Sequence, residues 1–171
     1  DKKDSVGICF VGERNMKDFL NRFIDFKPGP IMDDANNIIG EHHGSLLYTI
    51  GQRQGLRVGG VKDMPDLPWY VYKKDQNNNC LYVCQGEDNP LLFSKGLILE
   101  RLHWITDEFN GQLECEVQVR HRQKPIKCIL HINKLEVKFD KEIRAITPGQ
   151  SAVFYLDNIC LGGGIIADQI N

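Results

Sequence analysis

The chain has 171 residues, of which 42% are hydrophobic, 26% charged and 9% aromatic, a balance typical of a folded globular protein rather than a disordered one. Lys and Arg number 21 and Asp and Glu 23, so the formal charge is −2. This charge excludes a uniformly basic nucleic-acid binder but is compatible with a local basic patch. Apolar runs are far shorter than the roughly 20 residues of a membrane-spanning helix, so we expect no association with a membrane.

The chain begins with charged residues, without an initiator methionine or a signal-peptide pattern, so we expect a fragment or a mature piece. Residues 6–12 form a short apolar run bounded by glycines, which predicts a strand ending in a turn. From Glu13 to Ile24, apolar residues recur at helical spacing and opposite charges lie four positions apart, which predicts a helix. Apolar pairs at 31–32 and 38–39 flank a turn-forming segment and predict a hairpin.

Beyond the hairpin, Ser45 is placed to cap a short helix that reaches Ile50. Residues 51–60 contain four glycines and predict a loop or tight turns. Two strands, 69–73 and 80–85, follow, and residues 86–90 are typical of a linker.

The rest of the chain alternates between short apolar strands and turns. Residues 113–119 alternate apolar and polar side chains with a period of two. The six predicted strands are 97–99, 113–122, 128–132, 135–139, 151–155 and 159–166. We therefore predict a mainly β protein with a minor α part: a small α+β central domain at 1–86, then a C-terminal antiparallel β-barrel of about six strands at 87–171.

Six cysteines in 171 residues are too few for a disulfide framework. They include no Cys-x-x-Cys pair, so we expect no structural metal site. We expect an intracellular protein in which most of these thiols are reduced. The cysteines at 80, 115, 128 and 160 are interpreted as core residues. The acidic pair Asp33-Asp34 is interpreted as solvated rather than as a cation site. Adjacent histidines at 42 and 43 rarely both point inward, so we do not expect them to bind metal.

Cys9 is the cysteine most suited to chemistry. It lies at the predicted end of a strand and just before a helix, where unpaired N–H groups stabilise a thiolate. Such a cysteine can act as a nucleophile or carry sulfur. The alternative is a buried apolar cysteine, because both of its neighbours are large and apolar.

Two segments are basic and contain no acid. The glycine-rich loop carries Arg53 and Arg57, and glycine-rich backbone with arginines suits phosphate contact. Residues 117–135 carry five Lys or Arg, which predicts one basic face, and His121 adds a ring that can stack on a base. The alternatives are a solvated turn and an ordinary charged strand end.

Seven motifs occur in an order that resembles the C-terminal half of the bacterial-type tRNA-specific 2-thiouridylases. Each motif is weak alone, but the ordered set is specific and spans nearly the whole chain. The motifs are Ser5-Val-Gly-Ile-Cys9-Phe-Val-Gly12, Gly40-Glu-His42-x-Gly44, Tyr48-Thr-Ile-Gly-Gln-Arg53-x-Gly-Leu56, Pro68-Trp-Tyr-Val71, Arg120-x-Arg-Gln123, Thr147-Pro-Gly-Gln150 and Cys160-Leu-Gly-Gly-Gly164.

The resemblance implies an enzyme, a tRNA-uridine 2-sulfurtransferase. Members use ATP with Mg²⁺ to adenylate the C2 oxygen of the wobble uridine in tRNAs for Lys, Glu and Gln, and a cysteine persulfide then delivers sulfur. The resemblance assigns that persulfide to Cys9. It also implies that Cys9 can form a disulfide with a second active cysteine, which belongs to the N-terminal half.

The implied partners are tRNA and a persulfide sulfur donor, either a sulfur relay protein or a cysteine desulfurase. The expected tRNA-binding residues are Arg53, Arg57, Arg120, His121, Arg122 and Gln150. The expected location is the cytoplasm, or alternatively the mitochondrion.

The sequence departs from the family in two ways. The Ser-Gly-Gly-x-Asp-Ser loop that binds ATP is absent and belongs to the N-terminal half, so we expect this chain to be inactive alone. Gln54 stands where Lys is usual, and His121 where Tyr is usual. The competing hypothesis is a non-catalytic barrel that binds RNA or a protein.

Overall fold

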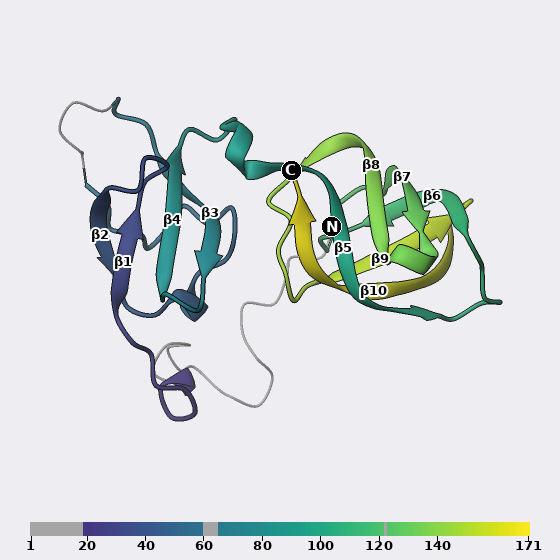
Figure 1. The fold of residues 1–171 in the computed structure, drawn as a ribbon, viewed down its shortest axis with the longest axis horizontal. Helices are drawn as coiled ribbons and strands as arrows, with labels where there is room; N and C mark the ends of the chain where they lie inside the picture. The colour runs from purple at the N-terminus through teal and green to yellow at the C-terminus, as the bar shows by residue number, and fades with distance from the viewer. Residues whose placement is uncertain (1–18, 60–64, 122) are drawn as a thin grey trace, which may run out of the picture.

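A computed structural model of the protein describes residues 19–59, 65–121 and 123–171 (Figure 1). As predicted, this part of the chain is mainly β, with a separate small sheet followed by a closed barrel (Figure 1). Apart from helical residues 19–20, helical structure in the described residues is limited to three 3-10 turns, η1 (Ser45–Leu47), η2 (Pro90–Leu92) and η3 (Ile132–Lys134). Among the described residues, no helix has the length and apolar character needed to span a membrane.

The first unit is a four-stranded sheet with the strand order β2-β1-β4-β3. Its strands are β1 (Gly29–Met32), β2 (Ile38–His42), β3 (Trp69–Asp75) and β4 (Cys80–Gln85). The predicted hairpin is present as β1 and β2, and the two predicted strands at 69–73 and 80–85 pair as β3 and β4. Strand β1 joins the two pairs through its parallel pairing with β4. Ile31, Val71 and Leu81 have no exposed surface and form the centre of the core of this unit.

Asp33 organises the turn between β1 and β2. Its carboxylate accepts hydrogen bonds from the backbone N–H of Ala35 at 3.0 Å and of Asn37 at 2.7 Å, and from the Asn37 amide at 2.9 Å. The side chain is buried, so the expectation that both acids of this pair are solvated is wrong for Asp33. Burial raises the pKa of Asp33, but the hydrogen bonds from Asn37 and Ala35 outweigh it and hold that pKa below its usual 3.8.

The second unit is a barrel that closes in the order β10-β5-β8-β7-β6-β9, entirely through antiparallel pairs. Its strands are β5 (Phe93–Trp104), β6 (Gln112–Gln118), β7 (Ile126–His131), β8 (Glu136–Arg144), β9 (Ser151–Leu156) and β10 (Ile159–Ile170). Alternate residues of β6, including Cys115 and Val117, are buried in the barrel core, as the period of two predicts. Closure pairs every strand and removes unpaired edges.

Several predicted boundaries are wrong. Residues 19–20 are helical, but residues 21–24, which the predicted helix included, are not, and Phe23, expected on its apolar face, is 73% exposed. Strand β6 ends at Gln118 rather than at 122, whereas β5 and β8 extend well beyond their predicted lengths. Cys160 is half-buried rather than a core residue. These differences arise at strand and helix ends, where tertiary packing outweighs local propensity.

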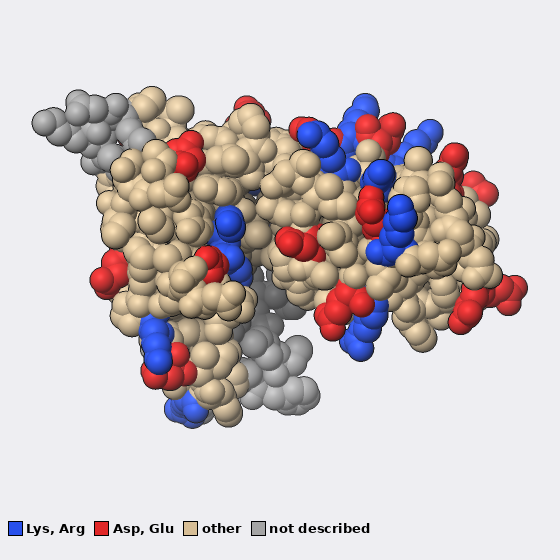
Figure 2. Space-filling model, viewed as in Figure 1, with Lys and Arg blue, Asp and Glu red and all other residues tan. Residues whose placement is uncertain are grey.

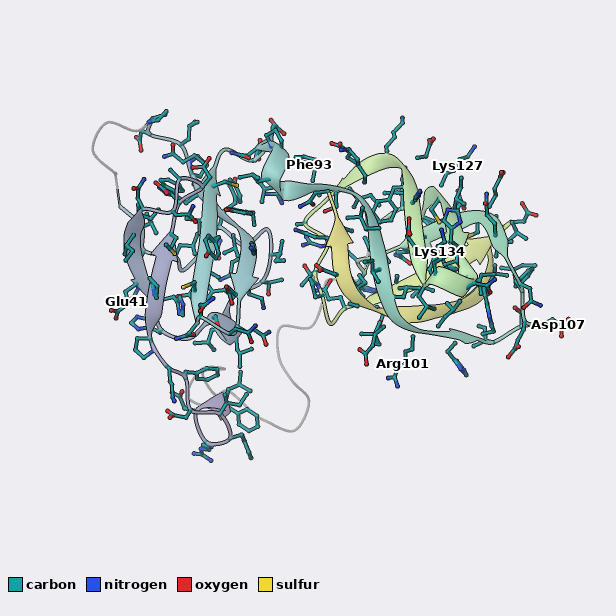
Figure 3. The ribbon with its side chains drawn as sticks, viewed as in Figure 1. Glu41, Phe93, Arg101, Asp107, Lys127 and Lys134 are labelled. Atoms are coloured by element: carbon teal, nitrogen blue, oxygen red, sulfur yellow. The ribbon has the colours of Figure 1, made fainter. Side chains whose placement is uncertain are left out.

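The two units are connected through η2. Asn89 caps this turn by accepting a hydrogen bond from the Leu91 N–H at 3.0 Å, and Pro90 occupies its first position. The chain then enters the barrel at Phe93, which lies between the sheet and the barrel (Figure 3). This turn is thus a short, capped link between the two units.

Candidate nucleic-acid interface

A hollow of about 920 Å³ lies between the sheet and the barrel. Three segments that are distant in sequence line it: residues 49–52 from the sheet unit, 118–121 after β6, and 149–155 from the turn before β9 and from β9 itself. The predicted tRNA-binding residues Arg120, His121 and Gln150 therefore meet at one place. All three side chains are exposed.

Arg120 links the two units directly. One of its guanidinium nitrogens, Nη2, donates to the carbonyl oxygen of Ile50 at 3.2 Å and to that of Ala145 at 3.0 Å. Ile50 belongs to the sheet unit and Ala145 to the barrel, so this single side chain bridges them. The sequence predicted only a nucleic-acid contact for Arg120, and this role in joining the units was missed.

Gly51 allows the two units to approach closely. A Cβ atom at this position would lie 2.6 Å from the Cβ of Ala145, and the φ angle of +82° also favours glycine. The loop is held in place by β3, because the Gly51 N–H donates to the Val71 carbonyl at 2.7 Å and the Val71 N–H donates to the Gln52 carbonyl at 3.0 Å. The glycine-rich loop is therefore ordered here.

Arg144 is a second cation at this junction that sequence reasoning missed. Its guanidinium lies 5.0 Å from the centre of the Tyr70 ring, and its Nε donates to the Glu87 carbonyl at 3.1 Å. Burial, followed by the charge of Arg144, lowers the pKa of Arg120. Among the described residues, no carboxylate forms an ion pair with either arginine, so the charge of this pair is available to an approaching anion.

Residues 147–150 form the turn that the sequence predicted. The Gln150 N–H donates to the Thr147 carbonyl at 3.3 Å, and Gly149 has a φ angle of +86°. Pro148 followed by a glycine with positive φ is typical of a type II turn. The turn is tied to β10 because the Gly149 N–H donates to the Ile166 carbonyl at 2.8 Å, and this fixes Gln150 at the rim of the hollow.

Two further polar residues that the sequence did not single out, Gln118 and Tyr155, also line the hollow. The Tyr155 hydroxyl donates to Oε1 of Gln118 at 3.2 Å, and the Gln118 amide donates to the Gln123 carbonyl at 2.8 Å. Their strand positions were predicted, but no sequence signal separates them from other polar residues on alternating strands.

Arg53 and Arg57 line a different hollow, of about 450 Å³, together with the segment that leads into β3. Both side chains are exposed. The structure thus separates Arg53 and Arg57 from Arg120, His121 and Gln150, although the loop that carries the two arginines begins at the hollow between the sheet and the barrel. Cys9 and Arg122 lie outside the described residues, so their predicted roles remain predictions.

The predicted single basic face is divided. Arg120 points to the sheet unit, whereas Lys127 lies directly opposite Glu116 in the β6–β7 pairing, on the part of the barrel away from the sheet (Figure 3). On the barrel surface seen in Figure 2, basic and acidic side chains are mixed. On the face seen in Figure 2, the described part of the barrel therefore presents no purely basic surface.

His42 has a structural role. It is fully buried, its Nε2 lies 2.9 Å from the Asn79 carbonyl, and its Nδ1 accepts from the Gly44 N–H at 3.0 Å. Both ring nitrogens are thus used within the protein. The described residues contain no group of three or more His, Cys, Asp or Glu that could hold a metal ion.

Comparisons with known proteins cover both units. Residues 17–85 match the family model described as a tRNA methyl transferase PRC-barrel domain, and residues 94–166 match the model described as an aminomethyltransferase beta-barrel domain. The chain is 51% identical over 174 residues to the tRNA-specific 2-thiouridylase MnmA of Pectobacterium carotovorum. It is 50% identical over 173 residues to the proteins of the same name from Serratia proteamaculans and Salmonella typhi.

In each of these three comparisons the alignment covers 99% of this chain but 47% of the relative. The chain therefore spans about half the length of the relatives it matches, and the half that it matches is the C-terminal one.

Proposed function

Because this chain belongs to the tRNA-specific 2-thiouridylase family and corresponds to its C-terminal half, we propose that it holds tRNA and carries the sulfur in the thiolation of uridine. The observation that carries this proposal is the junction between the two units. There, Arg120, His121 and Gln150 line one hollow. Arg120 is paired with backbone carbonyls and the nearby Arg144 with a carbonyl and an aromatic ring, and no carboxylate among the described residues pairs with either arginine. Such a site offers cationic donors to a phosphate and a ring to a base.

The proposed substrate is the wobble uridine of tRNAs for Lys, Glu and Gln. ATP, as its Mg²⁺ complex, adenylates the C2 oxygen of the uridine and releases pyrophosphate, in the half of the enzyme that this chain does not include. The terminal sulfur of a persulfide on Cys9 attacks C2, and AMP leaves with the former C2 oxygen. The second active cysteine then attacks the Cys9 sulfur, which breaks the S–S bond, leaves sulfur on the uridine and forms a disulfide.

In this proposal the chain does not bind ATP, so it is inactive alone. Arg120 and His121 orient the anticodon arm while Arg53 and Arg57 contact phosphates farther along the tRNA. A persulfide donor protein, a relay protein or a cysteine desulfurase, reloads Cys9. We place the reaction in the cytoplasm, with the mitochondrion as the alternative.

The experiment is a Cys9→Ser substitution in the full-length protein, with Cys160→Ser as the matched control. We expect Cys9→Ser to abolish 2-thiouridine formation, measured by mass spectrometry of tRNA nucleosides, while tRNA affinity stays within a factor of about 2, because the hydroxyl cannot carry a persulfide. Cys160→Ser should retain thiolation. Normal thiolation by Cys9→Ser would favour the competing hypothesis of a barrel that only binds RNA or protein.

A further inference from the structure

Cys115 and Cys128 face each other inside the barrel. They are directly opposite in the antiparallel pairing of β6 and β7, and their Sγ atoms are 3.7 Å apart. No part of the thiolation reaction uses either residue. Their side chains are 6% and 5% exposed and form part of the barrel core.

The backbone places this pair at disulfide distance. Residues directly opposite in an antiparallel ladder have Cα atoms about 4.5–5.5 Å apart, within the range of about 4.4–6.8 Å found in disulfides. The sulfur atoms must approach each other by less than 2 Å to reach a bond length of about 2.0 Å. Side-chain rotation can supply most of that movement, and the pairing of the strands need not change.

The other described cysteines lack this arrangement. Cys80 and Cys84 lie on the same strand, four positions apart, which separates them by about 13 Å along β4. Burial raises the pKa of Cys84 to about 11, which suppresses its thiolate. Cys160 is half-buried on β10. Within the described residues, Cys115 and Cys128 are the one pair with sulfur atoms in contact.

A hollow adjoins this cysteine pair. Cys115 and Cys128 both contribute to the wall of a hollow of about 840 Å³, together with Lys127, Lys138 and Phe139. Hydrogen peroxide is small enough to enter a space of this kind, whereas a bulky disulfide such as oxidised glutathione needs a more exposed sulfur.

We propose that Cys115 and Cys128 form a redox modification site, at which a hydroperoxide converts two thiols into a disulfide across β6 and β7. The Cys115 thiolate attacks one peroxide oxygen, the O–O bond breaks, and with one proton water leaves, so that sulfenic acid forms on Cys115. The Cys128 sulfur then attacks the Cys115 sulfur, its proton combines with the departing hydroxide as a second water, and the S–S bond forms. The peroxide is reduced by two electrons and the thiol pair is oxidised by two.

Either sulfur can donate the hydrogen bond between the two thiols. When Cys128 donates, the hydrogen bond lowers the pKa of Cys115 and raises that of Cys128. Cys115 is therefore the sulfur expected to react first, and Cys128 the sulfur that resolves the intermediate.

The test exposes the folded 171-residue chain to hydrogen peroxide, alkylates remaining thiols under denaturing conditions, and maps peptides by mass spectrometry. We expect one linked peptide pair containing Cys115 and Cys128, a mass lower by two hydrogen atoms, and a higher midpoint of thermal unfolding. A dithiol reductant should reverse all three. Alkylation of both cysteines after peroxide treatment, or a link between either of them and another cysteine, would overturn the proposal.

Single variants test the assigned order. Cys128→Ala should leave sulfenic acid on Cys115, detected with dimedone, whereas Cys115→Ala should leave Cys128 unoxidised. Cys84→Ala is the matched control for loss of a buried thiol and should still form the link. The peptide map of the unaltered chain decides the proposal even if a variant fails to fold, and it does so independently of thiolation.

Discussion

The guanidinium group of Arg120 donates two hydrogen bonds within the protein itself. Its two hydrogen bonds to carbonyls of different units link the sheet unit to the barrel, in addition to the proposed contact with tRNA. If Arg120 contacts tRNA as proposed, its replacement changes both that contact and the link between the two units that border the hollow.

Replacement of Arg120 by Met should therefore lower stability as well as tRNA affinity. We expect the free energy of unfolding to fall by about 1–2 kcal/mol, since two charge-assisted hydrogen bonds on a partly exposed side chain are removed. Urea unfolding of the chain measures this. The control is Lys134→Met, an exposed cation on the barrel (Figure 3), which should change stability by less than about 0.5 kcal/mol. Equal unfolding midpoints for both variants would contradict the bridging role.

Asp33 predicts a dependence of stability on pH. Because its folded pKa lies below that of the unfolded chain, Asp33 contributes stability that is fully present above about pH 5 and is lost as pH falls through the folded pKa. Asp33→Asn should lower stability at neutral pH and flatten its decline between roughly pH 5 and pH 2. Urea unfolding across this range checks the expectation, with the exposed neighbour Asp34→Asn as control. If the stability of Asp33→Asn fell with pH as steeply as that of the unaltered chain, other titrating groups would account for the pH dependence.

At the scale of elements, the turn at 147–150 positions a predicted tRNA contact. The turn depends on Gly149, whose φ angle of +86° penalises any residue with a Cβ, although nothing else lies near that position. Gly149→Ala should therefore cost about 1 kcal/mol of stability and displace Gln150. We expect weaker tRNA binding by full-length protein in filter-binding assays. Gly59→Ala is the control, since its backbone has no positive φ and a Cβ there meets nothing within 4 Å; an equal loss in both variants would refute the role of the turn.

At the scale of the whole molecule, four of the described arginines form two separate groups. Arg120 and Arg144 lie at the junction and bond to backbone carbonyls there, whereas Arg53 and Arg57 lie on the exposed loop of the sheet unit. Because the side chains of both loop arginines are exposed, their replacement tests tRNA binding with little effect on the fold.

Arg53→Gln combined with Arg57→Gln should reduce the salt dependence of tRNA binding. The slope of log affinity against log salt should fall by roughly one unit for each phosphate that the protein no longer binds, because fewer counterions are released. Titration of full-length protein with tRNA at several salt concentrations measures the slope. Lys127→Gln, on the part of the barrel away from the sheet, should leave it unchanged. An unaltered slope in the double variant would place the phosphate-binding residues elsewhere.

Local sequence patterns were sufficient to predict several secondary-structure elements and the family of this protein. Alternation at 113–119 predicted a barrel strand, Pro148-Gly149 predicted its turn, and the ordered motifs pointed to the correct family. These features follow from backbone geometry over a few residues, where the side-chain period and the sign of φ are determined locally.

Only the tertiary structure decided which distant residues meet. The parallel pairing of β1 with β4, the Arg120 bond to a carbonyl 70 positions earlier, and the opposition of Cys115 and Cys128 all depend on strand register and on the docking of the two units. Register is selected by burial of the whole apolar face rather than by any short motif, since a shift of one residue would expose that face. The composition and motifs therefore determined the fold class and family, and packing determined the geometry of the site.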